Sequence, residues 1–160
     1  MDRHTIQGIE VSFSGVYQHS IDAKGRTSLP SRFREILSAQ GADKLIVTNH
    51  LIDPCLVAFT PADWQAFTDK VAKAPMFDKD IRLLTRRFVA PAQECPVDKL
   101  GRILIPPTLR EQAGLGEEIT WAGVVARIEA WSPARWAEVQ RDAQDPAMLN
   151  DLAQRLSGFL

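Results

Sequence analysis

The hydrophobic positions of this chain change their spacing several times, and the changes predict short strands that alternate with short helices. Largely apolar segments predict strands at residues 45–48, 56–59, 119–121 and 124–131. The run Ile-Leu-Ile at residues 103–105 is typical of a strand that is buried on both faces. Apolar residues three and four positions apart predict helices between these runs. The chain is therefore expected to be mainly β with flanking helices, an α+β protein.

Several features predict where the helices begin and end. Pro30 and Pro106 each end a strand and precede a short helix, and Thr60 and Ser132 each precede a proline that suits the first position of a helix. Trp64 and Trp136 belong to the apolar stripes of these capped helices and are expected to pack in the core. Two further apolar stripes predict helices; their members are Phe77, Ile81, Leu84 and Phe88, and then Leu149, Leu152, Leu156 and Leu160. The last stripe has to be buried on its own domain or on another subunit.

One phrase of about ten residues occurs twice in the chain. Asp22-Ala-Lys-Gly-Arg-Thr-Ser-Leu-Pro30 returns as Asp98-Lys-Leu-Gly-Arg-Ile-Leu-Ile-Pro106, and every matched pair is 76 residues apart. Further on, Phe59-Thr-Pro-Ala-Asp-Trp64 returns as Trp131-Ser-Pro-Ala-Arg-Trp136, 72 residues later. A shift between matched anchors is what loop variation around a common core produces. The chain is therefore interpreted as an internal duplication.

The duplication gives an expected domain organisation in which two repeats form one compact unit. The expected parts are an N-terminal tail at 1–12 that is disordered, a first repeat at 13–75, a linker helix at 76–89, a second repeat at 90–144 and a C-terminal helix at 145–160.

Composition narrows the class of protein. A chain of 160 residues with 45% hydrophobic and 24% charged residues is ordinary for a folded protein. It has no apolar run near the roughly 20 residues that span a bilayer and no apolar stretch of signal-peptide type, so a soluble intracellular protein without a membrane partner is expected. Cys55 and Cys95 lack the spacing of zinc ligands and are expected to be buried thiols. No metal, cofactor or catalytic residue is expected.

Charge is distributed unevenly along the chain. The formal net charge is −1, yet the segments 15–40 and 80–111, which contain the two copies of the repeated phrase, each carry a net charge of +2. The acidic excess lies elsewhere in the sequence. Both motif regions are therefore locally basic within a nearly neutral protein, as is typical of a nucleic-acid contact.

The repeated phrases and their surroundings resemble a known family. The segment from Gly15 to Glu35, with its Asp-x-x-Gly-Arg, and the segment from Glu94 to Arg110, with a second Asp-x-x-Gly-Arg and then Ala113-Gly-Leu115, are similar to MraZ, the bacterial transcriptional regulators associated with the division and cell-wall gene cluster. The second copy alone resembles an AbrB-type DNA-binding half. The resemblance covers about residues 13–156, so residues 1–12 precede the usual start of the family.

The resemblance implies a fold, a function and a partner. The fold would be a pseudo-two-fold, swapped-hairpin β-barrel in which two AbrB-like units are fused in one chain. The function would be sequence-specific binding of double-stranded promoter DNA at repeated boxes, including the promoter of its own gene. The protein would form ring-like homo-oligomers and would be cytoplasmic and nucleoid-associated.

Residue chemistry points to the turns of the two repeated phrases. Gly25 and Gly101 are expected to adopt the positive φ of a tight turn, and Asp22 and Asp98 to hold these turns. The candidate DNA contacts are Lys24, Arg26, Lys99 and Arg102, because arginine makes forked contacts with guanine or phosphate and lysine acts as a point charge on phosphate. Among these four residues, Arg26 is the preferred candidate for a DNA contact. Leu100 stands where the first copy has Lys24, so the copies are not expected to contact DNA equally.

Alternatives remain open for these residues and for the chain. Asp22 can pair with Arg26, and Asp98 with Arg102, as structural clasps that need no ligand. Arg34-Glu35 and Arg110-Glu111 are interpreted as a solvated or ion-paired helix face. A ring-forming scaffold without sequence-specific DNA binding is the alternative function. An enzyme is not expected, because the histidines have no evident nucleophile partner and each motif aspartate is next to an arginine that lowers its pKa.

Overall fold

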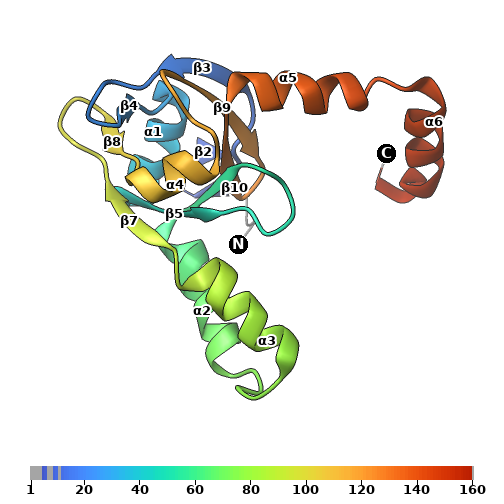
Figure 1. Cartoon of the computed structure of the whole chain (residues 1–160), viewed down its shortest axis with the longest axis horizontal. Helices are drawn as coiled ribbons and strands as arrows, with labels where there is room; N and C mark the ends of the chain where they lie inside the picture. The colour runs from blue at the N-terminus through green and yellow to red at the C-terminus, as the bar shows by residue number, and fades with distance from the viewer. Residues whose placement is uncertain (1–4, 7–8, 11, 160) are drawn as a thin grey trace.

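The computed structural model describes residues 5–6, 9–10 and 12–159, and it shows a mixed α+β fold (Figure 1). The strands are β1 (Thr5–Ile6), β2 (Ile9–Glu10), β3 (Val16–Ser20), β4 (Arg26–Ser28), β5 (Lys44–Asn49), β6 (Leu56–Phe59), β7 (Gln93–Pro96), β8 (Arg102–Leu104), β9 (Glu118–Val124) and β10 (Arg127–Trp131). The helices are α1 (Ser31–Ala39), α2 (Pro61–Ala72), α3 (Lys79–Leu84), the π-helix η1 (Thr85–Val89), α4 (Pro107–Gln112), α5 (Pro133–Asp142), α6 (Pro146–Arg155) and the 3₁₀-helix η2 (Ser157–Phe159).

The central sheet has six antiparallel strands in the order β3-β9-β10-β6-β5-β7. Each end of this sheet combines the two repeats. Strand β3 of the first repeat pairs with β9 of the second, and β7 of the second repeat pairs with β5 of the first. The hairpins β5–β6 and β9–β10 meet at the sheet centre through β6 and β10. The repeats therefore exchange their first strands and cannot be separated as two bodies.

The repeated phrases pair with each other in a separate two-stranded antiparallel ladder, β4–β8. Thr27 lies opposite Ile103, its equivalent 76 residues later. The flanking hydrogen bonds obey the same symmetry, because Leu29 N–H donates to the Gly101 carbonyl at 2.9 Å and Ile105 N–H donates to the Gly25 carbonyl at 3.0 Å. A pseudo-two-fold axis therefore passes through the middle of this ladder. Among the described residues the sheets remain open and do not close into one barrel.

The central sheet packs on both faces around β5 and β6, because successive side chains of a strand point to opposite faces. One face carries Leu45, Val47, Leu56 and Ala58, which join the main core with α1, α4 and the β4–β8 ladder. The other face packs under α2 and η1; its cluster contains Ile46, Val57, Phe59, Trp64, Phe67 and Phe88. The apolar runs in β5 and β6 therefore reflect burial on both faces; the sequence predicted these two strands, and predicted burial on both faces for residues 103–105 alone.

Two strand predictions were wrong in detail. Leu104 is 52% exposed, so β8 is buried on one face only; its outer face belongs to the surface of the two-stranded ladder. The predicted strand 124–131 starts too early: β10 covers Arg127–Trp131 and ends where predicted, but β9 ends at Val124 and residues 125–126 form the turn between the two strands. The turn between them holds Val125 at φ 71°, a left-handed conformation that apolar periodicity does not reveal.

The helix termini follow the predicted caps. Thr60 Oγ1 accepts a hydrogen bond from Asp63 N–H at 3.2 Å, and Ser132 Oγ accepts one from Arg135 N–H at 3.2 Å, each next to a proline at the first helical position. Trp64 packs against Phe59, with ring centroids 5.0 Å apart. Within the segment 76–89, α3 continues directly into η1.

The N-terminal segment is described in part, and the C-terminal segment forms a helix. Within the predicted tail 1–12, β1 and β2 pair with each other and the remaining residues up to 11 lie outside the described part, so the expected disorder stays a prediction. At the other end, α6 follows α5 and stands apart from the sheets in Figure 1. None of the described helices has the length and apolar character needed to cross a bilayer.

Candidate nucleic-acid interface

Both repeated phrases fold into the same tight turn, held by an aspartate. Asp22 Oδ1 accepts hydrogen bonds from Lys24 N–H and Arg26 N–H, both at 2.9 Å. In the second copy, Asp98 Oδ1 accepts equivalent bonds from Leu100 N–H and Arg102 N–H, again at 2.9 Å. The glycines complete each turn with φ values of 89° and 78° at Gly25 and Gly101, which a side chain would strain. The aspartate and glycine of the phrase therefore have a structural role in each copy.

The hydrogen bonds to these aspartates lower the pKa of their carboxyl groups below the ordinary 3.8. The largest cause is the backbone N–H of Arg26 for Asp22 and that of Arg102 for Asp98; the arginine side chains and the backbone N–H groups of Lys24 and Leu100 act in the same direction against some desolvation. A carboxylate with a lowered pKa stabilises the folded state above its unfolded pKa, and this contribution is lost as the pH falls through the folded value.

We expect the two turns to keep their full stability from pH 7 down to about pH 5 and to weaken below the ordinary aspartate pKa. Carbon-13 NMR titration of the Asp22 and Asp98 carboxyl groups would check this, and both midpoints should fall below 3.8. The control is the pair Asp22→Asn and Asp98→Asn, which keeps the acceptor oxygen and should remove this part of the acid sensitivity. A midpoint above the ordinary value would contradict the prediction.

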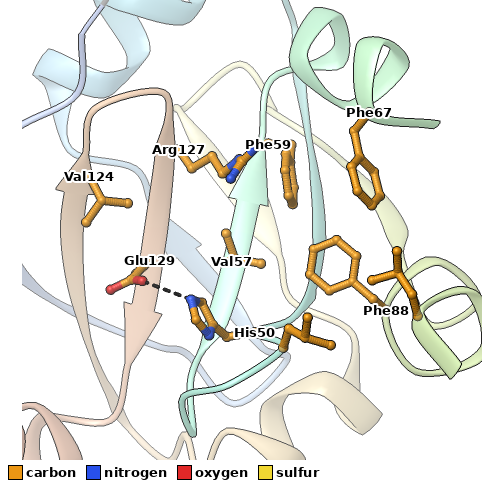
Figure 2. A pocket seen from close by; sticks show the side chains of 10 residues that line it. His50, Val57, Phe59, Phe67, Phe88, Val124, Arg127 and Glu129 are labelled. Atoms are coloured by element: carbon orange, nitrogen blue, oxygen red, sulfur yellow. Dashed lines mark ion pairs between the residues drawn. The ribbon is translucent and has the colours of Figure 1, made fainter. Parts of the chain in front are cut away.

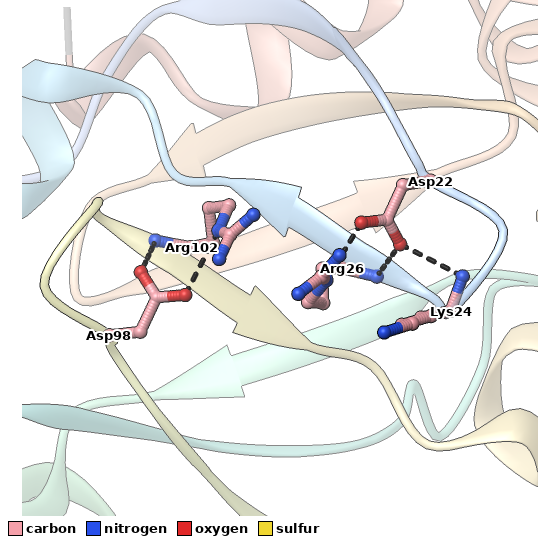
Figure 3. Close-up of polar contacts among 5 residues, drawn as sticks. All are labelled: Asp22, Lys24, Arg26, Asp98 and Arg102. Carbon is pink, nitrogen blue, oxygen red and sulfur yellow. Dashed lines mark hydrogen bonds and ion pairs between the residues drawn. The ribbon is translucent and has the colours of Figure 1, made fainter.

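Each aspartate also binds the arginine that follows the turn. Arg26 Nε donates to Asp22 Oδ2 at 2.7 Å, and Arg102 Nε donates to Asp98 Oδ2 at 2.9 Å (Figure 3). The structural clasp considered from the sequence therefore forms in both copies. It uses only Nε, and within the described part of the chain no hydrogen bond engages the terminal nitrogens of either guanidinium. A clasp through Nε orients the arginine and leaves its two NH₂ groups for a ligand.

The ladder register brings the two arginines to one surface. Thr27 and Ile103 are buried, so their neighbours in β4 and β8 point outward. Arg26 lies opposite Leu104 and Arg102 lies opposite Ser28, which makes the two arginines diagonal neighbours across the pseudo-two-fold axis (Figure 3). Their side chains are 36% and 32% exposed. We call the surface formed by Arg26, Ser28, Arg102 and Leu104 the ladder face.

The remaining predicted contacts lie on the turns at the two ends of the ladder. Lys24 is exposed on the first turn and Lys99 on the second, and neither has an ion pair among the described residues. Leu100, which takes the place of Lys24 in the second turn, is 69% exposed. All four predicted contact residues therefore belong to one ladder and its turns, and one end differs from the other in chemistry.

Two arginines that the sequence analysis assigned to a helix face lie against the turns instead. The space in which a side chain would grow from Gly25 is filled by the guanidinium of Arg110, and the same space at Gly101 is filled by that of Arg34. Arg110 Nε also donates to the Ile105 carbonyl at 2.9 Å. Each arginine comes from the other repeat. The constant 76-residue offset of Arg34 and Arg110 was the sequence signal that could have identified them.

Gly25→Ala is expected to destabilise the fold by about 1–3 kcal/mol, because alanine is strained at positive φ. The added Cβ would also lie 2.6 Å from Cζ of Arg110, although that side chain can shift. Chemical denaturation followed by circular dichroism would measure the change in the free energy of unfolding. Gly116→Ala is the matched control, since no atom lies within 4 Å of its Cβ position. Equal effects of the two substitutions would contradict the prediction.

A second cluster of polar groups lies on the opposite side of the central sheet, in a groove of about 270 Å³ (Figure 2). The side-chain N and O atoms of His50, Asp53 and Glu129 lie within 4.8 Å of one another, a spacing at which they could share a metal ion. His50 Nδ1 accepts hydrogen bonds from Ile52 N–H at 3.1 Å and Asp53 N–H at 2.9 Å. Nε2 of the same ring faces Glu129 Oε2 at 3.4 Å. Both ring nitrogens are engaged, so the cluster fits a structural polar contact better than a metal site.

The two cysteines do not form a reactive site in this structure. Cys55 and Cys95 are free thiols, 3% and 1% exposed, as the sequence predicted. Burial raises the pKa of Cys95 to about 11, and burial together with the nearby Glu129 and Asp53 carboxylates raises the pKa of Cys55 still further. Thiols with raised pKa values have little of the thiolate that reacts with electrophiles or metals.

Comparison with known proteins places the chain in a family. The family model described as "MraZ protein, putative antitoxin-like" matches twice in tandem, at residues 12–87 and 88–157. A protein named transcriptional regulator MraZ from Acetivibrio thermocellus is 45% identical over 130 residues, 81% of this chain and 87% of its own length. Relatives of the same name from Caldicellulosiruptor saccharolyticus and Carboxydothermus hydrogenoformans are 43% and 40% identical, over 89% and 92% of this chain and 94% and 99% of their own. The chain belongs to the MraZ family and carries two copies of its repeat.

Proposed function

We propose that this protein is a transcriptional regulator that binds double-stranded DNA sequence-specifically through the ladder face and its two turns. The observation that carries the proposal is the placement of Arg26 and Arg102 on one exposed surface, each held through Nε by its aspartate, with lysines on the adjoining turns. Pre-oriented arginines with free NH₂ groups suit forked hydrogen bonds to guanine O6 and N7.

The shape of the ladder supports the same proposal. The major groove of B-DNA admits a two-stranded β-ribbon, and β4–β8 is such a ribbon with its polar side outward. Arg26 and Arg102 would contact base edges, while Lys24 and Lys99 would contact phosphates and position the protein. Arg34 and Arg110, beside the turns, add positive charge to the same end surfaces. Each turn has one lysine at a different position, because Leu100 stands where the first copy has Lys24, so the two ends would contact phosphate differently.

The names of the relatives support the regulatory role. We propose further that the DNA consists of repeated boxes in the promoter of the division and cell-wall gene cluster, including the promoter of this protein's own gene. The protein would then act in the cytoplasm at the nucleoid. A non-enzymatic role agrees with the clasped aspartates, whose lowered pKa values do not suit a general acid.

We also propose that the fold is a member of the swapped-hairpin, AbrB-like class and that the protein works as a ring-like homo-oligomer. The exchange of first strands between the repeats and the pseudo-two-fold axis through β4–β8 support the first point. The homo-oligomer is proposed because of the affinity for DNA that a single copy would have. One copy presents only a few cations to DNA, so its binding would be weak, whereas several linked copies on repeated boxes raise avidity by about 10²–10⁴.

The alternative function is a ring-forming scaffold that does not bind DNA sequence-specifically. The exposed apolar residues on the helices outside the central sheets favour some form of assembly under either proposal. The two differ in their behaviour toward DNA. A regulator discriminates between sequences and loses affinity as salt rises, because bound cations displace counterions from the phosphates. A scaffold would show no preference for one DNA sequence over another.

Fluorescence anisotropy with the purified protein tests the proposal. The probes are the DNA upstream of its own gene and a scrambled duplex of equal length and composition, each at two salt concentrations. We expect tighter binding to the upstream DNA at both concentrations and a loss of affinity on both probes as salt increases. Equal affinity for the two probes would overturn the proposed function and favour the scaffold.

A further inference from the structure

Helix α6 has an apolar stripe that the described residues leave partly exposed. Its members Met148, Leu149, Leu152 and Leu156 are each 40–44% exposed, and α6 has no buried residue. Asp145 caps the helix at its N-terminus, so it is a defined element and its stripe has a fixed direction. Figure 1 shows α6 beyond the end of α5, away from the central sheet and the β4–β8 ladder. An amphipathic helix in this position needs an apolar surface to pack on.

The first repeat has a partly packed counterpart of this stripe. At the 72-residue offset, Met148, Leu149 and Leu156 correspond to Met76, Phe77 and Leu84 of the linker region. Met76 and Phe77 are 71% and 82% exposed, so Leu84 is the one of the three that packs. There the chain turns back after α2, and Leu84 and Phe88 pack on the sheet beside Phe59. The ring centroids of Phe88 and Phe59 are 5.7 Å apart. The second repeat has a matching apolar stripe but holds it away from the sheet.

The groove of about 270 Å³ that has His50 and Glu129 in its lining lies open beside that packed segment. We call it the sheet groove, and define it by Val57, Phe59, Phe67, Phe88, Val124 and Arg127 (Figure 2). Its volume of about 270 Å³ falls below the usual range of small-molecule sites, while its lining is mostly apolar. Arg127 lies over the Phe59 ring at 4.7 Å and binds Asp63 at 3.1 Å, so the groove has a fixed wall. Val124, 41% exposed, forms part of its open side.

Charge complements these two surfaces. The segment 78–89, which contains α3 and η1 beside the sheet groove, carries Lys79, Arg82, Arg86 and Arg87 against Asp78 and Asp80, a net charge of +2. The segment 138–155, which contains the end of α5 and all of α6, carries Glu138, Asp142, Asp145 and Asp151 against Arg141 and Arg155, a net charge of −2. Opposite charges guide two surfaces into contact and disfavour contact between two copies of the same surface. The basic α3–η1 surface of one molecule is therefore complementary in charge to the acidic end of α5 and start of α6 of another.

We infer that α6 of one copy docks in the sheet groove of a second copy, with the α3–η1 surface receiving the acidic end of α5 and the start of α6. The partner is this same chain, so the inference rests on the homo-oligomer within the proposed function and names the surfaces that build it. The two surfaces differ, which makes the contact head-to-tail, and each added copy leaves one α6 and one groove free. Repetition of such a contact gives a closed ring when the rotation from one copy to the next is a whole fraction of a full turn.

Two single variants and their mixture test the inference by light scattering after size-exclusion chromatography. Leu152→Glu places a charge on the α6 stripe, and Val124→Glu places one in the groove. Each should raise the concentration of half-assembly about a hundredfold or more, because an unpaired carboxylate would be buried in the contact. An equimolar mixture should form heterodimers, since the first variant retains an intact groove and the second an intact α6.

Gln154→Glu is the matched control, because it adds the same charge to the opposite side of α6 and should assemble as the wild type does. A monomeric wild type, full assembly of Leu152→Glu, or a mixture that remains monomeric would each overturn the inference. Arg26→Ala should assemble normally. Failure of the assembled wild type to discriminate between DNA sequences would overturn the proposed function and leave this inference standing.

Discussion

Replacing both arginines of the ladder face, Arg26→Ala together with Arg102→Ala, is expected to abolish the preference for specific DNA while the protein still folds. Each forked contact with guanine contributes about 1–3 kcal/mol of discrimination, so the two together account for roughly 30- to 10⁴-fold in relative affinity. Each side chain is about a third exposed and points away from the core, so its loss leaves the packing intact. Competition anisotropy between specific and scrambled DNA measures the ratio directly.

Two comparisons make this experiment specific. Lys24→Ala with Lys99→Ala should weaken binding to all sequences alike and reduce the salt dependence, because these lysines would contact phosphates. Lys70→Ala removes an exposed cation from the last turn of α2, away from β4 and β8 in Figure 1, and should change neither affinity nor preference. A double arginine variant that retained full preference would show that the ladder face does not read the DNA.

Phe33→Ala is expected to cost about 3–5 kcal/mol of folding free energy, the largest single effect on stability that we predict. Phe33 is fully buried in α1, and its ring meets Phe13 and Tyr17 edge-on at centroid distances of 5.5 and 5.4 Å. Loss of the Phe33 side chain leaves a cavity where α1, β3 and the β4–β8 ladder meet. Urea denaturation would measure the change.

The control for this substitution is Ile52→Ala, which removes an apolar side chain that is 85% exposed in the loop between β5 and β6. Its effect should stay within about 0.5 kcal/mol. If the two substitutions had similar effects, the main core would not be organised around α1 as the structure shows.

The parts of the fold that the sequence predicted are those with local causes. The caps at Thr60 and Ser132, the strands β5 and β6 and the buried cysteines all follow from neighbouring residues. The pairing of β3 with β9 follows from contacts between residues about a hundred positions apart, which no local pattern encodes. The exposed side of Leu104 could not be predicted either, because an apolar residue opposite Arg26 is indistinguishable in sequence from a core residue.

The candidate site was predictable in its residues and less so in its assembly. The repeated Asp-x-x-Gly-Arg identified both turns and left the clasp and the DNA contact as competing roles for Arg26. The geometry makes the two roles compatible, since Nε serves the clasp and the NH₂ groups remain free. Arg34 and Arg110 were assigned to a solvated face because helical position does not show which turn of the other repeat lies beside them.

The exchange of first strands also sets the order in which the chain can fold during its synthesis. Strand β3 leaves the ribosome early, yet its partner β9 ends at Val124, about a hundred residues later. At roughly 5–20 residues per second, the first repeat waits about 5–20 seconds for the strand that completes its edge. Strand β5 waits about half as long for β7, which ends at Pro96. The nascent first repeat therefore exposes two unpaired edges at first, and the edge of β3 until β9 is made; chaperones that shield such edges would protect it.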